Sequence, residues 1–209
     1  MKTGKFIVFE GADGTGKSSA VESARDYLMA SGHRALIVKN PGATPVGAEI
    51  RRLTKSDQHP LGSTIGLLMA ADWSETLRRI VIPNLESGIH VLADRYNYVS
   101  GLVYNDIHMV RLLYTQILKD SPVCDALFYL KADHKYIVSR LLSRADVPLD
   151  HWDRECLKEA GYNRLAERYD KAVQSLEGHV MFNRIIPVDA NEPQHKIRGM
   201  VARYLDEIV

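Results

Sequence analysis

Five short runs of consecutive apolar residues divide the chain, and the segments between them carry apolar residues at helical spacing. The runs cover residues 6–9, 35–38, 89–93, 126–130 and 184–188, and are apolar except for His90 and Arg184. Runs that are apolar at successive positions, instead of alternate ones, indicate strands that helices cover on both faces. Five such strands alternating with helices predict an α/β fold with a parallel sheet and helices on both of its faces.

The helices are predicted from apolar positions that recur three and four residues apart. The first helix follows the strand at 6–9 and ends near Gly32, because glycine readily terminates helices. The segment 145–153, which contains Pro148, breaks the helical pattern. The remaining helices are expected at 44–54, 62–87, 99–119, 133–144, 162–176 and 197–208.

The turn after the first strand has the pattern of a phosphate-binding loop. The residues from Gly11 to Ser18 fit G-x-x-x-x-G-K-[ST] without a mismatch. Glycines let the backbone turn its N–H groups toward phosphate oxygens, the lysine supplies a cation, and the serine hydroxyl suits Mg²⁺. The following helix directs its positive end at the same anion. The residues expected to bind nucleotide phosphates are Gly11, Asp13, Gly14, Thr15, Gly16, Lys17, Ser18 and Ser19.

A second candidate site is Asp94-Arg95, which follows the apolar run at 89–93. Ligands of open parallel sheets gather at the carboxyl ends of the strands, where the phosphate-binding loop also opens. A carboxylate at Asp94 can hold Mg²⁺ through water, and Arg95 can clamp a second phosphate. The alternative is an ordinary ion pair at the end of a strand.

Composition narrows the class of protein. The 209 residues have a net charge of +1, with 25% charged and 45% apolar residues. This composition does not indicate binding to nucleic acid or to a membrane. Cys124 and Cys156 are far apart and lack partners at metal-ligand spacing, so we expect two free thiols in a reducing compartment. No apolar run is long enough for a signal peptide or a membrane helix. A single cytoplasmic domain over residues 1–209 is expected.

Four motifs resemble the thymidylate kinase family in the same order and at similar separations. They begin at Phe9, Pro41, Asp94 and Val188 and read FEGADGTGKS, PGATPVG followed by Ile50-Arg51, DRY and VDA. The resemblance implies a P-loop fold whose five strands lie in the order 2-3-1-4-5. It also implies ATP as phosphoryl donor, a deoxynucleoside monophosphate as acceptor, Mg²⁺ between them, and a homodimer.

The resemblance also implies roles for single residues. Lys17 would lie on the donor phosphates, Arg95 on the acceptor phosphate, and Asp13 near the acceptor sugar and phosphate. Lys39 falls where the family usually has a phosphate-binding Arg, and a Lys supplies the charge without the bidentate fork. Arg51 is assigned to the acceptor as well. Ala190, in the segment Asp189 to Asn191, would border the adenine.

The phosphate-binding loop departs from the family at Gly14, where some members place an Arg. The missing cation is then expected from a mobile lid at about residues 144–155. Arginines Arg140, Arg144 and Arg154 flank this segment. Arg144 is expected on the transferred phosphate and Arg140 on adenine or phosphate, and the alternative is that these are solvated helix charges.

The residues that would recognise the base also differ from the family. Met69 stands where an aromatic ring usually stacks on the base, and Trp73 where an Arg usually hydrogen-bonds thymine. With one extra residue in the alignment, Tyr104 falls beside the sugar and Asn105 where a Gln often reads the base; Ser100 is a further candidate. Either Trp73 stacks on the base and thymine is still accepted, or a different or modified base is accommodated, in which case Trp73→Arg should narrow the range.

The function expected from these features is ATP-dependent phosphorylation of dTMP to dTDP. The alternatives are a kinase for another deoxynucleoside monophosphate, a deoxynucleoside kinase, and a P-loop protein that binds nucleotide without catalysis. A second anion site at Lys39 and Arg95 argues against the last two.

Overall fold

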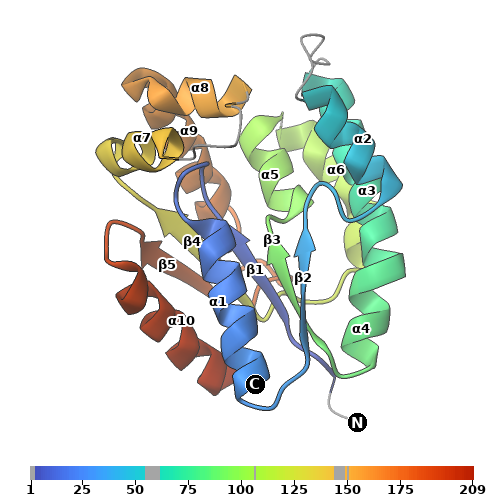
Figure 1. Ribbon diagram of the computed structural model, residues 1–209. Coiled ribbons are helices and arrows are strands. Elements are labelled where there is room, and N and C mark those ends of the chain that lie inside the picture. The colour runs from blue at the N-terminus through green and yellow to red at the C-terminus, as the bar shows by residue number, and fades with distance from the viewer. Residues whose placement is uncertain (1–2, 55–61, 106, 144–148, 150) are drawn as a thin grey trace.

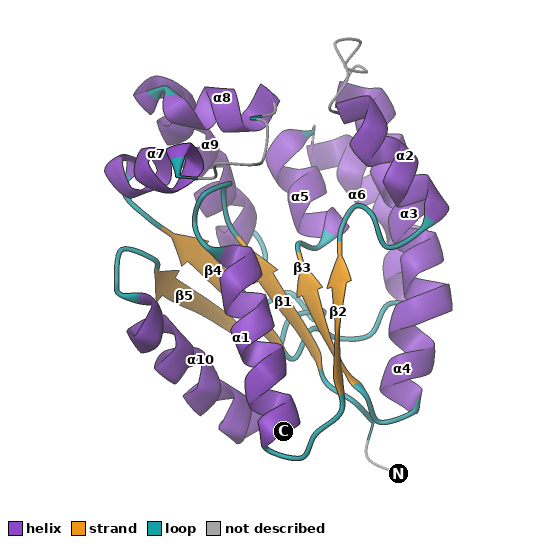
Figure 2. Ribbon diagram, in the orientation of Figure 1, coloured by secondary structure: helices purple, strands orange, loops and turns teal. Residues whose placement is uncertain are grey.

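The computed structural model describes residues 3–54, 62–105, 107–143, 149 and 151–209. Its centre is a sheet of five parallel strands in the order β2-β3-β1-β4-β5, so the predicted α/β fold and strand order are confirmed. All five arrows point toward the same edge (Figure 2). The strands are β1 (Phe6–Glu10), β2 (Ala35–Lys39), β3 (His90–Asp94), β4 (Ala126–Lys131) and β5 (Ile185–Asp189).

Helices cover both faces of the sheet (Figure 1). On one face α1 (Lys17–Ala30) packs against α10 (Gln194–Ile208). On the other, α5 (Asn97–Tyr104) packs against α3 (Gly62–Thr76), α6 (Ile107–Lys119) and α9 (Glu159–Gln174). Three helices lie nearer the carboxyl ends of the strands, namely α2 (Pro45–Thr54), α7 (His134–Leu142) and α8 (His151–Leu157).

Two of the predicted helices are divided in the structure, and one segment predicted to break the helical pattern is partly helical. The segment 62–87 is α3, then a π-helical turn at Leu77–Val81, then α4 (Ile82–Glu86). The segment 99–119 is two helices, because Asn105 is extended, with φ −127° and ψ 177°, and ends α5. The segment 145–153 is not wholly irregular, since α8 begins at His151.

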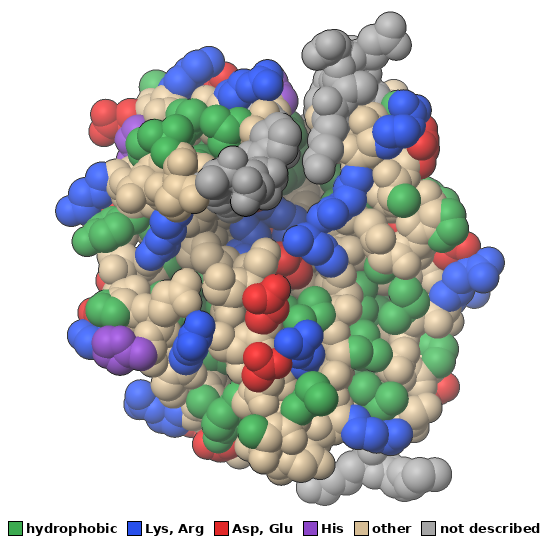
Figure 3. Space-filling view, viewed as in Figure 1, with side chains coloured by type: hydrophobic (Ala, Val, Ile, Leu, Met, Phe, Trp, Pro, Cys, Tyr) green, Lys and Arg blue, Asp and Glu red, His purple; other side chains and the backbone are tan. Residues whose placement is uncertain are grey.

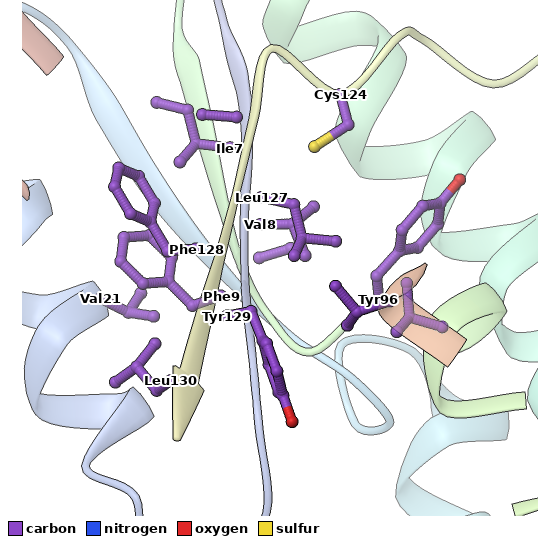
Figure 4. Packing of buried hydrophobic residues seen from close by; sticks show 14 of the residues in the cluster. Ile7, Val8, Phe9, Val21, Tyr96, Cys124, Leu127, Phe128, Tyr129 and Leu130 are labelled. Carbon is purple, nitrogen blue, oxygen red and sulfur yellow. The ribbon is translucent and has the colours of Figure 1, made fainter. Parts of the chain in front are cut away.

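The core explains why the strands are apolar at successive positions. Every residue of β1 is buried, because α1 lies against one face of the strand and α5 lies near the other. Phe9 stacks on Phe128 of β4 with ring centroids 4.9 Å apart (Figure 4). Within the described residues, no helix is both long and apolar enough to cross a bilayer.

Candidate active site

A cavity of about 810 Å³ opens at the carboxyl ends of the strands. Lys and Arg side chains gather around a hollow on this part of the surface (Figure 3). The cavity brings together most of the residues that the sequence assigned to ATP, the acceptor and the metal. Those that line it are Asp13, Gly14, Gly16, Lys17, Ser18, Ser19, Lys39, Arg51, Met69, Asp94, Arg95, Ser100, Tyr104, Asn105 and Arg140. Gly11, Thr15, Trp73 and Ala190 are not among the lining residues.

The phosphate-binding loop connects β1 to α1 and depends on its glycines. Gly11 has φ +147°, and a Cβ there would lie 2.3 Å from the carbonyl oxygen of Leu130 in the neighbouring strand. Gly16 has φ +89° and directly precedes the first turn of α1. Thr15 closes the loop internally, because its hydroxyl donates to the carbonyl of Ala12 at 2.8 Å. The loop therefore approaches its neighbours more closely than side chains would allow.

Lys17 is buried within this loop. Its Nζ donates to the carbonyl of Ala12 at 2.8 Å and lies 3.8 Å from Oδ1 of Asp13. Burial and the nearby Arg95 guanidinium lower the pKa of Lys17 to about 8, although Asp13 opposes the shift. An anion in the cavity would raise this pKa and keep the ammonium charged.

Arg95 has a left-handed backbone, with φ +75°, which is uncommon for a residue with a side chain. This conformation follows the end of β3 and turns the guanidinium toward the loop. Its Nη2 donates to Oδ1 of Asp13 at 2.6 Å, and its Nη1 donates to the hydroxyl of Tyr169 at 2.6 Å. Burial disfavours the charge, but Asp13 and neighbouring groups outweigh burial and raise the pKa of Arg95.

Sequence reasoning missed two residues that hold Arg95. Tyr169, on α9, is fully buried and accepts the hydrogen bond described above. Glu10, at the end of β1, is also buried; its carboxylate lies 3.8 Å from Nη1 of Arg95 and accepts the backbone N–H of Tyr96 at 2.7 Å. Burial raises the pKa of Glu10, and Arg95 opposes that shift. A carboxylate inside an apolar strand was the signal available for Glu10, whereas nothing local marks Tyr169.

The candidate metal ligands lie next to each other. Ser18 is the second residue of α1, and its hydroxyl donates to Oδ2 of Asp94 at 2.8 Å. The same carboxylate oxygen is 4.0 Å from Nζ of Lys39, so these three residues join α1, β2 and β3 at one corner of the cavity. A hydroxyl and a carboxylate are hard oxygen ligands, which is the type that Mg²⁺ prefers, so the residues fit this ion.

The loop after β2 contributes the remaining acceptor candidates. Asn40 donates its Nδ2 to the carbonyl of Arg95 at 2.9 Å, which ties this loop to the left-handed turn. Arg51, on α2, donates its Nε to the carbonyl of Pro41 at 2.7 Å and lines the cavity. Lys39 and Arg51 thus stand near Arg95 at one end of the cavity.

Arg140 links the phosphate-binding loop to the end of β5. Its Nη2 donates to the carbonyl of Ala190 at 2.7 Å, and its Nη1 donates to the carbonyls of Thr15 and Gly14 at 3.4 and 3.5 Å. Arg154 is exposed on α8 and does not line the cavity. Arg144 and the first half of the expected lid lie outside the described residues, apart from residue 149.

Trp73 does not face the base site, which corrects the sequence-based expectation. Its side chain is 0% exposed and belongs to the core, where it stacks on Phe6 at 6.0 Å and packs on Tyr96 at 4.7 Å. Its neighbour Asp72 is also buried and accepts the Thr44 hydroxyl at 2.6 Å. Met69 and Trp73 are four residues apart and so lie on the same face of α3. Met69 lines the cavity, whereas Trp73 lies one turn farther along the helix, where Phe6 and Tyr96 cover its ring.

Trp73→Arg is accordingly expected to unfold the protein instead of narrowing its base selectivity. A guanidinium at this position would lose the aromatic packing and lack a buried partner for its charge. We expect the free energy of unfolding to fall by at least about 3 kcal/mol. Urea unfolding followed by circular dichroism measures this, and Ala71→Arg on the exposed face of the same helix is the control. A stable, folded Trp73→Arg protein would contradict the core assignment.

The other base candidates line the cavity. Met69 of α3 and Tyr104 and Asn105 at the end of α5 line it, with Ile65 beside them. Asn105 donates its Nδ2 to the carbonyl of Gly101 at 3.4 Å, while its buried Oδ1 accepts no hydrogen bond from the described residues. Ser100 donates its hydroxyl to Glu10 at 3.3 Å and so supports the network around Arg95.

Comparison with known proteins identifies the family. A family model described as thymidylate kinase matches residues 9–198. The thymidylate kinase of Chlorobaculum tepidum is 31% identical over 219 aligned positions that cover 97% of each chain. That of Gloeobacter violaceus is 32% identical over 97% of this chain and 96% of its own, and that of Caldicellulosiruptor saccharolyticus is 43% identical over half of each chain. The chain therefore belongs to the thymidylate kinase family.

Proposed function

We propose that this chain transfers the γ-phosphoryl group of ATP to dTMP and releases ADP and dTDP. The observation that carries the proposal is the meeting of two cations at Asp13, whose Oδ1 lies 2.6 Å from Nη2 of Arg95 and 3.8 Å from Nζ of Lys17. Lys17 belongs to the donor loop, and Arg95 to the strand end assigned to the acceptor. Adjacent phosphate sites are what direct phosphoryl transfer requires.

The family fixes the class of reaction. Thymidylate kinases are nucleoside monophosphate kinases that use ATP as phosphoryl donor. The sequence-based case for a wider base range rested on Met69 and Trp73 standing where the family usually has an aromatic ring and an Arg, and the burial of Trp73 does not restore that Arg. Membership of the thymidylate kinase family nevertheless supports thymine as the base. We therefore take dTMP as the acceptor.

Each residue near the cavity has a role in the proposal. The loop amides and Lys17 hold the donor phosphates, with Arg140 on phosphate or adenine next to Ala190. Lys39, Arg51 and Arg95 hold the acceptor phosphate, and Asp13 orients the acceptor sugar. Because Gly14 has no side chain, the further cation comes from Arg140 or from Arg144, which stays a prediction. Met69, Ser100, Tyr104 and Asn105 surround the nucleoside.

The chemistry of this reaction is mostly charge neutralisation and positioning. Mg²⁺, held by the Ser18 hydroxyl and, through water, by Asp94, would offset negative charge on the donor phosphates. Asp13 keeps Lys17 and Arg95 at a fixed separation, and Tyr169 and Glu10 fix the guanidinium that receives the acceptor. Trp152 and Tyr104 line the same cavity, and the ring of Tyr104 lies 6.3 Å from that of Tyr169, beside Arg95.

We further propose a cytoplasmic homodimer. The helices α3 and α6 pack together and leave Leu67 53% exposed and Leu112 77% exposed, and both helices offer apolar surface to a second copy. Cys124 and Cys156 are buried free thiols, which suits a reducing compartment. Sedimentation of a species of 23.5 kDa alone at micromolar concentration would speak against the dimer.

The test is ADP release with a panel of acceptors. We expect release with dTMP in the presence of ATP and Mg²⁺, and none with thymidine, because Lys39, Arg51 and Arg95 require a phosphate. The other deoxynucleoside monophosphates define the base range. Equal use of thymidine would favour a nucleoside kinase, and ATP binding without ADP release for any acceptor would favour a non-catalytic nucleotide-binding protein.

A further inference from the structure

Trp152 lines the cavity, and sequence reasoning assigned no function to this residue. It lies in the first turn of α8, is half-buried, and lines the same cavity as Met69 and Tyr104. Its ring packs on that of Tyr104 with centroids 4.6 Å apart and planes 55° apart. Trp152 therefore extends the aromatic surface of α5 from the side of α8.

The helix that carries Trp152 is held in place by its neighbours. α8 packs against both α7 and α9. Nε2 of His134, on α7, lies 3.1 Å from the carbonyl of Cys156 and 3.2 Å from that of Leu157, so the imidazole caps the C-terminal end of α8. Cys156 and Asp153 on the same helix are buried. The indole ring is thus positioned by packing on two helices and by a capping hydrogen bond.

The charges of the cavity decide which part of a nucleotide reaches Trp152. The acceptor phosphate belongs with Arg95, Lys39 and Arg51, so its base must lie against the apolar side chains of the lining. These include Ile65 and Met69 of α3, Tyr104 of α5 and Trp152 of α8. Neither Met69 nor the buried Trp73 can offer a ring from α3 to the base. Apart from the exposed His151, the aromatic side chains among the described lining residues are Tyr104 and Trp152.

We infer that Trp152 is a substrate-binding residue that stacks its indole on the base of the acceptor nucleotide. The inference rests on the proposed function, because it takes the acceptor to be a deoxynucleoside monophosphate. Stacking depends on the π face of the base and not on its hydrogen-bonding edge. Trp152 therefore adds affinity for every pyrimidine acceptor, while selectivity falls to polar groups such as Asn105.

Fluorescence tests the contact directly, because Trp73 and Trp152 are the two tryptophans of the chain. Excitation at the red edge of tryptophan absorption, with dTMP as titrant, should give a saturable change in emission in the wild type. Trp152→Phe, which keeps the buried Trp73, should lose that change, and Trp73→Phe should keep it. The inference would be overturned if dTMP still changed the emission of Trp152→Phe as it does in the wild type. It would also be overturned if dTMP did not change the emission of Trp73→Phe.

Kinetics test the contribution to affinity. Trp152→Ala should raise KM for dTMP about tenfold, raise KM for dUMP by a similar factor, and leave KM for ATP within about twofold. Trp152→Phe retains an aromatic face for stacking, so its KM for dTMP should be much closer to that of the wild type than to that of Trp152→Ala. If both variants keep the wild-type KM for dTMP, Trp152 only packs α8 on Tyr104.

Two controls separate this inference from other failures. Circular dichroism melting shows whether Trp152→Ala is folded, and the milder Trp152→Phe with its fluorescence readout remains decisive if it is not. The proposed function fails if the wild type phosphorylates none of the panel. The inference fails if dTMP is phosphorylated but neither KM nor fluorescence depends on Trp152.

Discussion

Lys17→Ala is expected to lower kcat by on the order of a thousandfold while the protein stays folded. The loss follows from position: Lys17 is buried in the donor loop, and in the proposed reaction its ammonium is the cation that the loop offers to the transferred phosphate. Folding should change little, because the lost hydrogen bond is to the carbonyl of Ala12 and the side chain faces the cavity instead of the core.

The measurement is coupled ADP release at saturating ATP and dTMP, together with circular dichroism melting. Lys171→Ala is the matched control, because Lys171 is exposed on α9 and forms a surface ion pair with Glu167. Turnover close to that of the wild type in Lys17→Ala would refute the assignment of the loop. Turnover lost in both variants would point to a general defect instead.

The pKa of Lys17 adds a pH dependence to the same prediction. Burial lowers that pKa to about 8 in the free protein, so above this pH the side chain is increasingly neutral. ATP binds the charged form better, and the KM for ATP should therefore rise as the pH increases through about 8. Lys17→Ala should lack this rise. The KM for dTMP is measured separately at each pH, so that a change in dTMP binding is not mistaken for one in ATP binding.

The sequence was sufficient for the sheet and for the donor loop. Strands covered on both faces need apolar residues at successive positions, and the chain has five such runs with few others to compete. The loop was predictable because its glycines adopt backbone conformations that side chains disfavour, as φ +83° at Gly14 and +89° at Gly16 illustrate. Both signals lie within about ten neighbouring residues, where spacing alone defines the structure.

The remaining features depend on contacts between distant parts of the chain. Trp73 was misassigned because an alignment gives the position of a residue along α3 but does not show that Phe6 and Tyr96, from other parts of the chain, cover the side chain there. Tyr169 lies 74 residues from Arg95 and bonds it only after α9 packs on α5. Trp152 lies within the segment 145–153, which has no helical periodicity, so nothing in the sequence assigned it to α8 or to the cavity.

Variants of Arg95 are expected to lose activity, and their stabilities are expected to follow an unusual order. Arg95→Ala and Arg95→Gly both remove the guanidinium that would bind the acceptor phosphate, and we expect kcat/KM for dTMP to fall by on the order of a thousandfold. Arg95→Lys keeps the positive charge but lacks the forked guanidinium, so it cannot make the hydrogen bonds to Asp13 and Tyr169 at the same time. We therefore expect an intermediate loss of kcat/KM. Tyr169→Phe should lose less kcat/KM for dTMP than any of the three Arg95 variants.

The stabilities follow from the backbone of Arg95. Glycine usually destabilises a folded protein relative to alanine, but at φ +75° an alanine keeps the left-handed strain that glycine lacks. Arg95→Gly should therefore be more stable than Arg95→Ala by about 1 kcal/mol in urea unfolding, although both leave Glu10 and Asp13 without their nearest guanidinium. If alanine were the more stable of the two, the left-handed turn would be wrong. If kcat/KM survived in either variant, the acceptor phosphate would have to bind at Lys39 and Arg51 without Arg95, and the meeting of the two cations at Asp13 would no longer explain the reaction.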